Sequence, residues 1–294
     1  MASWLTCTLM TLYGSCRPAD VASFYTIELS RCVDETCSWM KSNRLQSNPD
    51  KAEVLWCATS RRQYQLPTTA LLIDGAAVDP VTSVRDPRIH IDVDLVMRTH
   101  VQLTVQYQDV SLHFASYVRS AIRYHHPCPS HWWSLVLSRL DYGNAVLVGI
   151  PAYLVRRLQS VLNAAARLIY HMRSTDHITD ALVSLRWLRV PERIQYKIAL
   201  LTYEVLQGSA PRYLGPLARV TYQPGRRTLH SASSSSLLVP PFKPSTVGSR
   251  VFSVAGPRVW NTLPEETTSA PSLTIFCQRL KTWLVRQSHP YLII

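Results

Sequence analysis

The 294-residue sequence predicts an α+β fold, in which one helix and a small antiparallel sheet precede a mainly helical region. Before about residue 98, short apolar runs alternate with polar residues, and Asp74-Gly75 is a hairpin signal. From Pro151 the apolar residues recur instead every three or four positions, as on an amphipathic helix. Since 47% of the residues are hydrophobic, the chain can bury a sizeable core.

The first hundred residues contain the expected sheet. A helix is predicted over Ala19–Met40, where apolar side chains keep helical spacing. A short strand is predicted at Ala52–Thr59, and a hairpin around Asp74-Gly75. Residues Ile89–Leu95 alternate apolar and polar, which indicates a half-buried strand with solvated carboxylates at Asp92 and Asp94.

Three amphipathic helices are expected in the second part of the chain. Pro151–Met172 carries one apolar stripe and begins at a proline, a residue common in the first turn of helices. The others are predicted over Pro191–Leu206, with Gly208 as a C-terminal cap, and over Ser272–Gln287. The segment Tyr222–Ser249 is rich in Ser, Pro, Gly and Arg and is predicted to be a loop or linker.

Charge is distributed unevenly along the chain. Residues 1–100 have a net charge of −1, whereas residues 101–294 have a net charge of +13. A strongly basic half suggests a polyanionic partner such as the RNA or DNA backbone. The alternative is a solvated arginine-rich surface that has no partner.

The seven cysteines are odd in number, scattered and without a C-x-x-C pair, which favours reduced thiols in the cytoplasm or nucleus. The first 14 residues lack the basic start of a secretion signal. No apolar run approaches the roughly 18 residues of a membrane span, so no membrane partner is expected.

Two long strings give the chain a specific resemblance. Residues 135–144 read Leu-Val-Leu-Ser-Arg-Leu-Asp-Tyr-Gly-Asn, and residues 151–168 read Pro-Ala-Tyr-Leu-Val-Arg-Arg-Leu-Gln-Ser-Val-Leu-Asn-Ala-Ala-Ala-Arg-Leu. Together with Phe252–Asn261 and Ser269–Leu273, they resemble the reverse transcriptase (RNA-directed DNA polymerase) of LINE-type non-LTR retrotransposons, a class of transposable element.

The resemblance implies a division into five regions. Residues 1–105 would be a truncated remnant of the polymerase palm with a hairpin like the primer grip, and 135–221 a helical thumb-like domain. Residues 222–249 would be the linker and 250–294 a helical tail. Residues 106–134 break the family pattern, as a shift of reading frame would do.

The resemblance also indicates that the polymerase carboxylates are missing. Just before Leu12 the family has Tyr-Ala-Asp-Asp, whose paired carboxylates hold two Mg²⁺ ions, but this chain has Cys7–Thr11. The remaining carboxylate of that site would lie upstream of Met1. We therefore expect no catalytic residue, no metal site and no cofactor. The sequence also lacks the G-x-S-x-G, Walker A, H-E-x-x-H and G-x-G-x-x-G motifs.

By the same resemblance, five basic residues are candidates for contact with a nucleic-acid backbone: Lys51, Arg156, Arg157, Arg167 and Arg173. Solvated surface charge is the competing interpretation for each. Trp187, Trp260 and Trp283 could stack on bases, but their spacing favours the core.

Two other features are not expected to form functional sites. Pro87-Arg88 replaces the Leu-Gly of the family hairpin, and arginine is not expected to adopt the positive φ that glycine tolerates. The cluster of His125, His126, Cys128 and His131 is interrupted by prolines, so no zinc site is expected.

The sequence thus predicts a degenerate polymerase fragment without polymerase activity that binds nucleic acid weakly and without sequence preference. Two alternatives remain open. The chain is a translated relic with no partner, or it is a segment of an intact reverse transcriptase whose catalytic residues lie upstream. The sequence leaves its oligomeric state and its preference for RNA or DNA undetermined.

Overall fold

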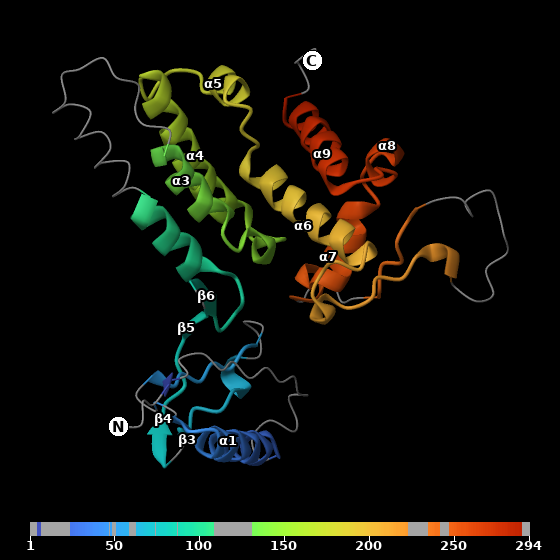
Figure 1. Cartoon of the computed structure of the whole chain (residues 1–294). Helices are drawn as coiled ribbons and strands as arrows, with labels where there is room; N and C mark the ends of the chain where they lie inside the picture. Colours follow the sequence, from blue (N-terminus) through green and yellow to red (C-terminus); the bar gives the residue numbers. More distant parts are fainter. Residues whose placement is uncertain are drawn as a thin grey trace. The chain divides into compact units, whose positions relative to one another are not determined.

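A computed structural model describes residues 5–6, 24–46, 48, 51–58, 63–73, 75–86, 88–108, 131–222, 235–241 and 247–289 (Figure 1). Helices and short strand pairs are both present, which confirms the predicted α+β class. The chain divides into two compact units, Met1–His100 and Val101–Ile294. The helical residues 98–108 span this boundary.

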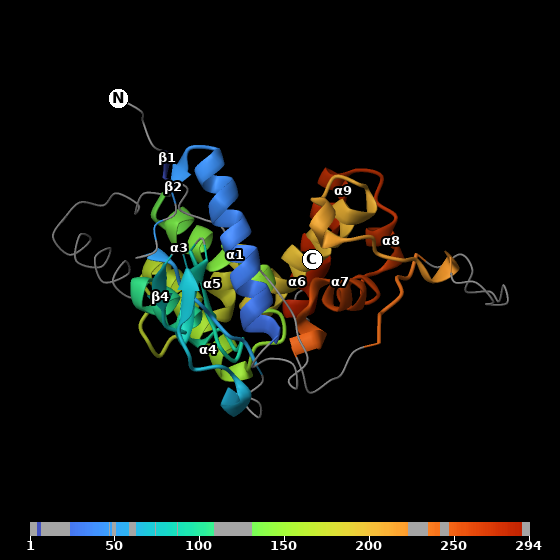
Figure 2. The ribbon, with the colours of Figure 1, turned by 90° about the horizontal axis from the view of Figure 1, so that it is seen from below.

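The first unit is built on the long helix α1 (Phe24–Ser42), drawn in blue in Figure 2. Its buried side chains, Val33, Cys37 and Met40, follow the helical spacing that predicted it. After α1 the chain forms β2 (Leu45–Gln46), which pairs in parallel with β1 (Leu5–Thr6).

A hairpin of β3 (Leu71–Ile73) and β4 (Ala76–Val78) confirms the Asp-Gly signal, with Gly75 at φ +84°. Leu71 and Val78 pack with Val54 in a small core. The strand predicted over Ala52–Thr59 is wrong, because its described residues, 52–58, contain a single bridge, from Val54 to Pro80. Proline has no N–H, so the bridge does not extend into a ladder.

The second hairpin, β5 (Ser83–Asp86) with β6 (Ile89–Asp92), forms with Arg88 at φ +75°. The expectation that arginine would not adopt a positive φ at this turn is therefore wrong, although such a conformation is strained for a residue with a Cβ. Asp92, expected to be solvated, is only 7% exposed, and its Oδ2 accepts the N–H of Thr99. The bond joins Asp92 to the first turn of the helical residues 98–108, so its carboxylate is engaged by that turn and not by solvent.

Helices dominate the described part of the second unit. They are α3 (His131–Asp141), η4 (Asn144–Leu147), α4 (Ala152–Tyr170), α5 (Thr179–Ser184), α6 (Val190–Leu206), η5 (Arg212–Leu214), η6 (Val220–Tyr222), η8 (Val247–Arg250), α7 (Phe252–Trp260), α8 (Glu265–Thr268) and α9 (Leu273–Ser288). The three predicted helices correspond to α4, α6 and α9, with ends within two residues of those expected. Gly208 follows α6 at φ +72°, as a C-terminal glycine should.

Helix α6 is the centre of this unit and packs against α4, α7 and α9 (Figure 1). The contact with α7 requires a glycine. A Cβ added to Gly256 would lie 2.9 Å from Oγ1 of Thr202 on α6, and Thr202 is fully buried. Gly256 therefore permits a close approach of the two helices.

Aromatic residues from three helices form the core of the second unit. The rings of Tyr203 (α6) and Phe276 (α9) stack with centroids 4.4 Å apart, and Trp260 (α7) stacks on Phe276 at 5.9 Å. Leu237 joins this cluster at 1% exposure, although it belongs to the Ser- and Pro-rich segment 222–249. Among the described residues, no helix is both long and apolar enough to cross a membrane.

Candidate nucleic-acid interface

The exposed face of α4 carries basic side chains without an acidic neighbour on the same helix. Arg156 and Arg157 are exposed, and their guanidinium groups make no ion pair with another described residue. No Asp or Glu occurs in the 19 residues of α4. Tyr153 and Tyr170, 43% and 44% exposed, lie near the two ends of the helix. Together they form the α4 face.

The sequence determines which side of α4 faces outward. Leu154, Leu158 and Leu162 are at most 3% exposed and, with other apolar residues, bury the opposite side. Pro151 precedes the helix, and His171 ends it in a left-handed conformation at φ +54°. A helix fixes the points from which its arginines extend, and each guanidinium group can bind a phosphate with two hydrogen bonds.

Of the four predicted arginines in this region, Arg156, Arg157 and Arg167 lie on α4, and Arg173 follows in the next turn. Arg167 is half-buried, and its Nε is shielded from solvent without a hydrogen-bond partner in the described structure. Arg173 is exposed, but its backbone N–H donates to Asp176 Oδ2 at 2.6 Å, which places a negative charge nearby. Arg156 and Arg157 are therefore the best placed for phosphate contact.

Lys51 belongs to the first unit. It is exposed, and its backbone N–H donates to the carbonyl of Asn48 at 3.1 Å. Lys51 therefore lies on the surface as ordinary lysines do, and it adds positive charge there without forming part of a binding pocket.

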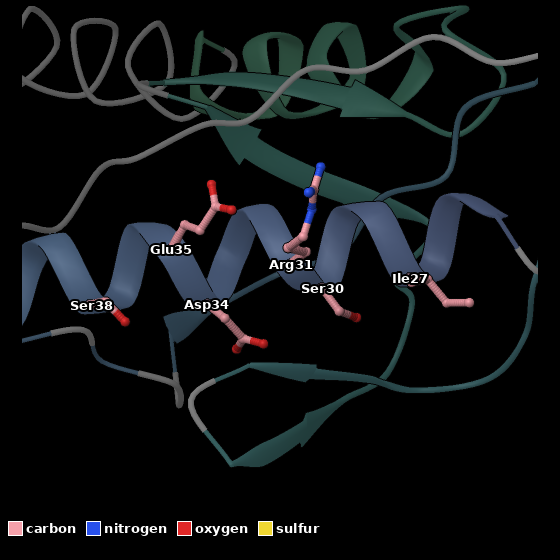
Figure 3. Close-up of a pocket in the computed structure, with 6 residues that line it drawn as sticks. All are labelled: Ile27, Ser30, Arg31, Asp34, Glu35 and Ser38. Atoms are coloured by element: carbon pink, nitrogen blue, oxygen red, sulfur yellow. The ribbon is translucent and has the colours of Figure 1, made fainter.

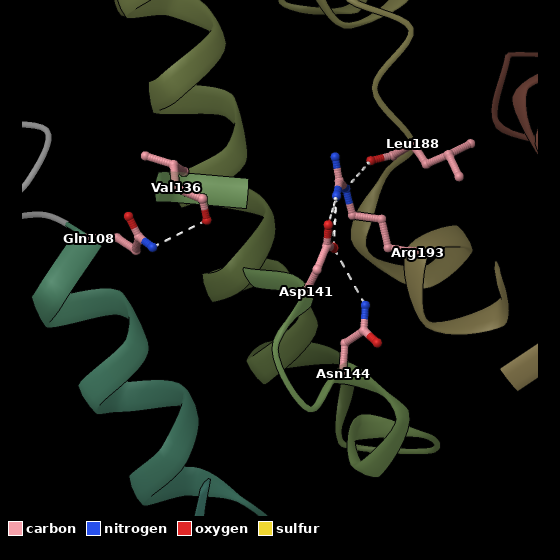
Figure 4. Close-up of polar contacts among 6 residues, drawn as sticks. All are labelled: Gln108, Val136, Asp141, Asn144, Leu188 and Arg193. Atoms are coloured by element: carbon pink, nitrogen blue, oxygen red, sulfur yellow. Dashed lines mark hydrogen bonds and ion pairs between the residues drawn. The ribbon is translucent and has the colours of Figure 1, made fainter. Parts of the chain in front are cut away.

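A polar frame holds the helices around α4. Asp141, the last residue of α3, accepts two hydrogen bonds of 2.7 Å from Nη1 of Arg193 on α6 (Figure 4). Arg193 also donates from Nε to the carbonyl of Leu188 at 3.0 Å, and Asn144 approaches Asp141 at 3.5 Å. Because Asp141 and Arg193 pair with each other, we assign them a role in holding α3 against α6 and not in ligand binding.

Helix α4 also caps α6. Gln159 Oε1 accepts the N–H of Val190, the first residue of α6, at 2.9 Å, and Gln159 Nε2 donates to Asn163 at 2.9 Å. One amide side chain thus satisfies a backbone donor that α6 leaves unpaired at its start. It also fixes α4 beside α6.

The side chains of Trp260 and Asn261, at the end of the string Phe252–Asn261, hold part of the predicted linker, residues 222–249, by hydrogen bonds. Asn261 pairs with both backbone groups of Leu237, accepting its N–H at 2.8 Å and donating to its carbonyl at 2.9 Å. Trp260 Nε1 donates to the carbonyl of Ser235 at 3.1 Å. Further along the chain, Arg250 donates from Nε to the carbonyl of Val148 at 2.8 Å. Trp260 and Asn261, two residues of a string that carries the resemblance, therefore stabilise the fold.

Sequence reasoning missed the two exposed tyrosines of the α4 face. The signal was available, because Tyr153 and Tyr170 lie three residues from Arg156 and Arg167 and hence on the same side of a helix. Exposed aromatic rings beside cations are a common feature of surfaces that hold single-stranded nucleic acid.

Two neighbouring carboxylates of the first unit, Asp92 and Asp94, are engaged by nearby groups of the chain. Asp92 Oδ2 accepts the Thr99 N–H, while Asp94 forms an ion pair with Arg98 at 2.9 Å and accepts the Val96 N–H. No group of three His, Cys, Asp or Glu side chains in the described ranges is placed to hold a metal. Cys7–Thr11 and the His125–Cys128 part of the histidine cluster lie outside these ranges, as does the side chain of His131.

A shallow hollow of about 680 Å³ lies along α1 (Figure 3). Its lining residues, from Ile27 to Ser38, all come from this one helix, with Arg31 and Glu35 one turn apart. A binding site needs polar groups that converge from several directions. The hollow along α1 is therefore a helix surface and not a site.

The chain matches no protein-family model, no curated protein and no solved structure. The likeness to LINE reverse transcriptases consequently stays a prediction from the sequence strings.

Proposed function

We propose that this protein derives from a non-LTR retrotransposon reverse transcriptase and binds the backbone of RNA or DNA without sequence preference through the α4 face. The observation that carries the proposal is the pair Arg156 and Arg157, exposed on a helix without carboxylates. The net charge of +13 on residues 101–294 supports it, because phosphate neutralisation dominates sequence-independent binding.

Nucleotide addition is not part of the proposal. Two-metal phosphoryl transfer requires carboxylates that converge on two ions. The Asp92 and Asp94 side chains are engaged in hydrogen bonds and an ion pair near the start of a helix instead. Incorporation of nucleotides by the purified chain, abolished by a chelator, would contradict this part of the proposal.

The binding test compares the native chain with the variant Arg156→Ala/Arg157→Ala on a primer–template duplex across a series of salt concentrations. Binding should weaken as salt rises, since each neutralised phosphate releases counterions. The double variant should bind several-fold more weakly, and its logarithmic salt slope should be shallower by about two.

The matched control is Arg212→Ala/Arg219→Ala, which removes the same charge from two exposed positions outside α4. It should bind nearly as the native chain does. Equal losses in both double variants would show a diffuse charge effect and would refute a specific α4 face, as would binding that does not respond to salt.

The relic alternative makes a different prediction. A chain that has lost its packing unfolds gradually, whereas the core around Phe276, Leu280 and Leu284, each fully buried, should melt cooperatively. Absence of a cooperative transition in calorimetry would favour the relic.

A further inference from the structure

The three candidate tryptophans occupy different environments. Trp260 is 3% exposed and belongs to the core, as its spacing predicted, and Trp187 is half-buried. Trp283 on α9 packs one side against the core cluster and also lines a cleft between α8 and α9. Of these three tryptophans, Trp283 is the one that lines a described cleft.

Two arginines flank Trp283 in this cleft, which has a volume of about 470 Å³. Arg279, Trp283 and Arg286 are spaced four and three residues apart, so they share one face of α9. The two arginines are separated by about 10 Å along the helix axis, with the indole between them. The volume is within the range of small-molecule sites.

The second wall of the cleft holds Arg279 in position. Nη1 of Arg279 donates to the backbone carbonyl of Glu266 in α8. This bond uses one of the five N–H donors of a guanidinium group, so others remain to face a ligand. Gln278 and Thr282 add neutral hydrogen-bonding groups to the lining. Glu266 is the acidic residue of the lining, and the two arginines outweigh its charge, so the net charge of the cleft is positive.

We propose that the cleft between α8 and α9 binds one nucleotide of a single-stranded nucleic acid, with its base against Trp283 and its flanking phosphates near Arg279 and Arg286. The inference rests on the proposed function, because it assigns a strand preference to the same class of polyanion. A base has a π-face that can stack on an indole, and each base of a strand lies between two phosphates. An acidic peptide would satisfy the arginines but would leave the indole without a partner.

Single strands are favoured over duplexes by this arrangement. A base within a duplex is already stacked and paired, and it reaches a protein pocket only after extrusion from the helix. A base in a single strand needs no such step. The arginines of the α4 face can contact the phosphates of either form, so a preference for single strands is assigned here to the cleft beside Trp283.

The test measures binding of the full chain to a labelled oligothymidylate and to a duplex of the same length by fluorescence anisotropy. Trp283→Leu keeps an apolar group against the core but removes the stacking surface. It should weaken oligothymidylate binding by roughly tenfold, the effect expected for one stacked base, and leave duplex binding unchanged. Trp283→Phe retains a ring and should largely restore binding.

Unchanged oligothymidylate binding by Trp283→Leu, or an equal loss for the duplex, would overturn the inference. So would binding of polyglutamate that depends on Trp283, since that result would identify an acidic peptide as the occupant. Should Trp283→Leu fail to fold, as judged by thermal unfolding, Arg279→Gln is the second test. It alters an exposed residue and should weaken single-strand binding several-fold without affecting the duplex.

The two proposals fail separately. If Arg156→Ala/Arg157→Ala binds both ligands as the native chain does, the α4 face is wrong. The comparison of Trp283→Leu with Trp283→Phe on oligothymidylate still tests whether a base stacks on Trp283 in the cleft.

Discussion

The two units differ in the way that they are held together. Residues 1–100 rely on short strand pairs around Val54, Leu71 and Val78, and they carry a net charge of −1. Residues 101–294 enclose an aromatic core shared by α6, α7 and α9, and they carry a net charge of +13. The positive charge thus accompanies the unit with the larger described core, where helices can present arginines from rigid positions.

The contrast also concerns the polar groups. In the second unit, side chains such as Asp141, Gln159 and Asn261 connect elements that are distant in sequence. In the first unit, the described bonds of Asp92 and Asp94 are local and prepare the start of a helix. We therefore expect single substitutions to cost more in the second unit than in the first.

The largest expected effect is that of Phe276→Ala, which empties the centre of the aromatic core. Phe276 is fully buried and stacks on Tyr203 and Trp260. The loss should be about 3–5 kcal/mol in the free energy of unfolding of the second unit. Hydrogen exchange of peptides from each unit would measure it, and protection in the first unit should be unchanged.

Leu71→Ala is the matching change in the first unit, where the smaller core should lose about 2–3 kcal/mol. Leu273→Ala, at a residue 44% exposed in α9, is the control and should change stability by less than about 0.5 kcal/mol. A cost for Phe276→Ala no greater than that for Leu71→Ala would contradict the comparison.

A smaller loss is expected from Asp141→Asn, which removes the charge that holds Arg193. The arginine side chain is only 13% exposed and would keep at most one of its two bonds to residue 141. We expect a loss of about 1–2 kcal/mol in chemical denaturation, the range of a charge-assisted hydrogen bond. Asp180→Asn, at an exposed position of α5, is the control; a similar effect of both would mean that the ion pair contributes nothing.

In the first unit, Arg88→Gly should be stabilising by about 0.5–1 kcal/mol. Glycine adopts the positive φ of Arg88 without the steric cost of a Cβ, although it loses more chain entropy on folding. The midpoint of denaturation reports the effect. Arg85→Gly, in the middle of β5, should have the opposite sign.

The smallest contrast concerns pH. Burial lowers the pKa of His289 in the second unit, and nearby Arg189 lowers it further against the opposing effect of Glu192. Burial likewise lowers the pKa of His100 in the first unit, assisted by His90 and opposed by Asp92. The unfolded chain then binds protons first as pH falls below about 6.5, so both units should lose stability on acidification and keep it above that pH.

Unfolding measured at a series of pH values, with His100→Gln and His289→Gln, would separate the two contributions. Each variant should reduce the loss of stability on acidification in its own unit. An unaltered pH dependence in His289→Gln would rule out that residue as a source of the effect.

How much the sequence could predict follows from the range of the interactions. Helices α4, α6 and α9 were predicted because apolar spacing is a local property that many residues repeat. The strand predicted at Ala52–Thr59 does not form: the bridging partner of Val54 is Pro80, which has no N–H to donate to a ladder, and no local pattern identifies that partner. The burial of Leu237 depended on Asn261, 24 residues away.

The candidate site shows the same limit. Exposed Arg156 and Arg157 follow from the helical period alone. The half-burial of Arg167 depends on the neighbours of α4 rather than on its sequence. The pairing of Asp141 with Arg193 joins residues 52 positions apart, and no local pattern indicates it. The cleft beside Trp283 likewise requires the placement of α8 against α9.

The shared core of α6, α7 and α9 constrains the protein during synthesis. Tyr203 emerges from the ribosome long before Phe276, its stacking partner, so for that interval the apolar side of α6 has no cover from α9. Translation that stalls within this interval should yield a chain with exposed aromatic surface, a target for chaperones and a hazard for aggregation.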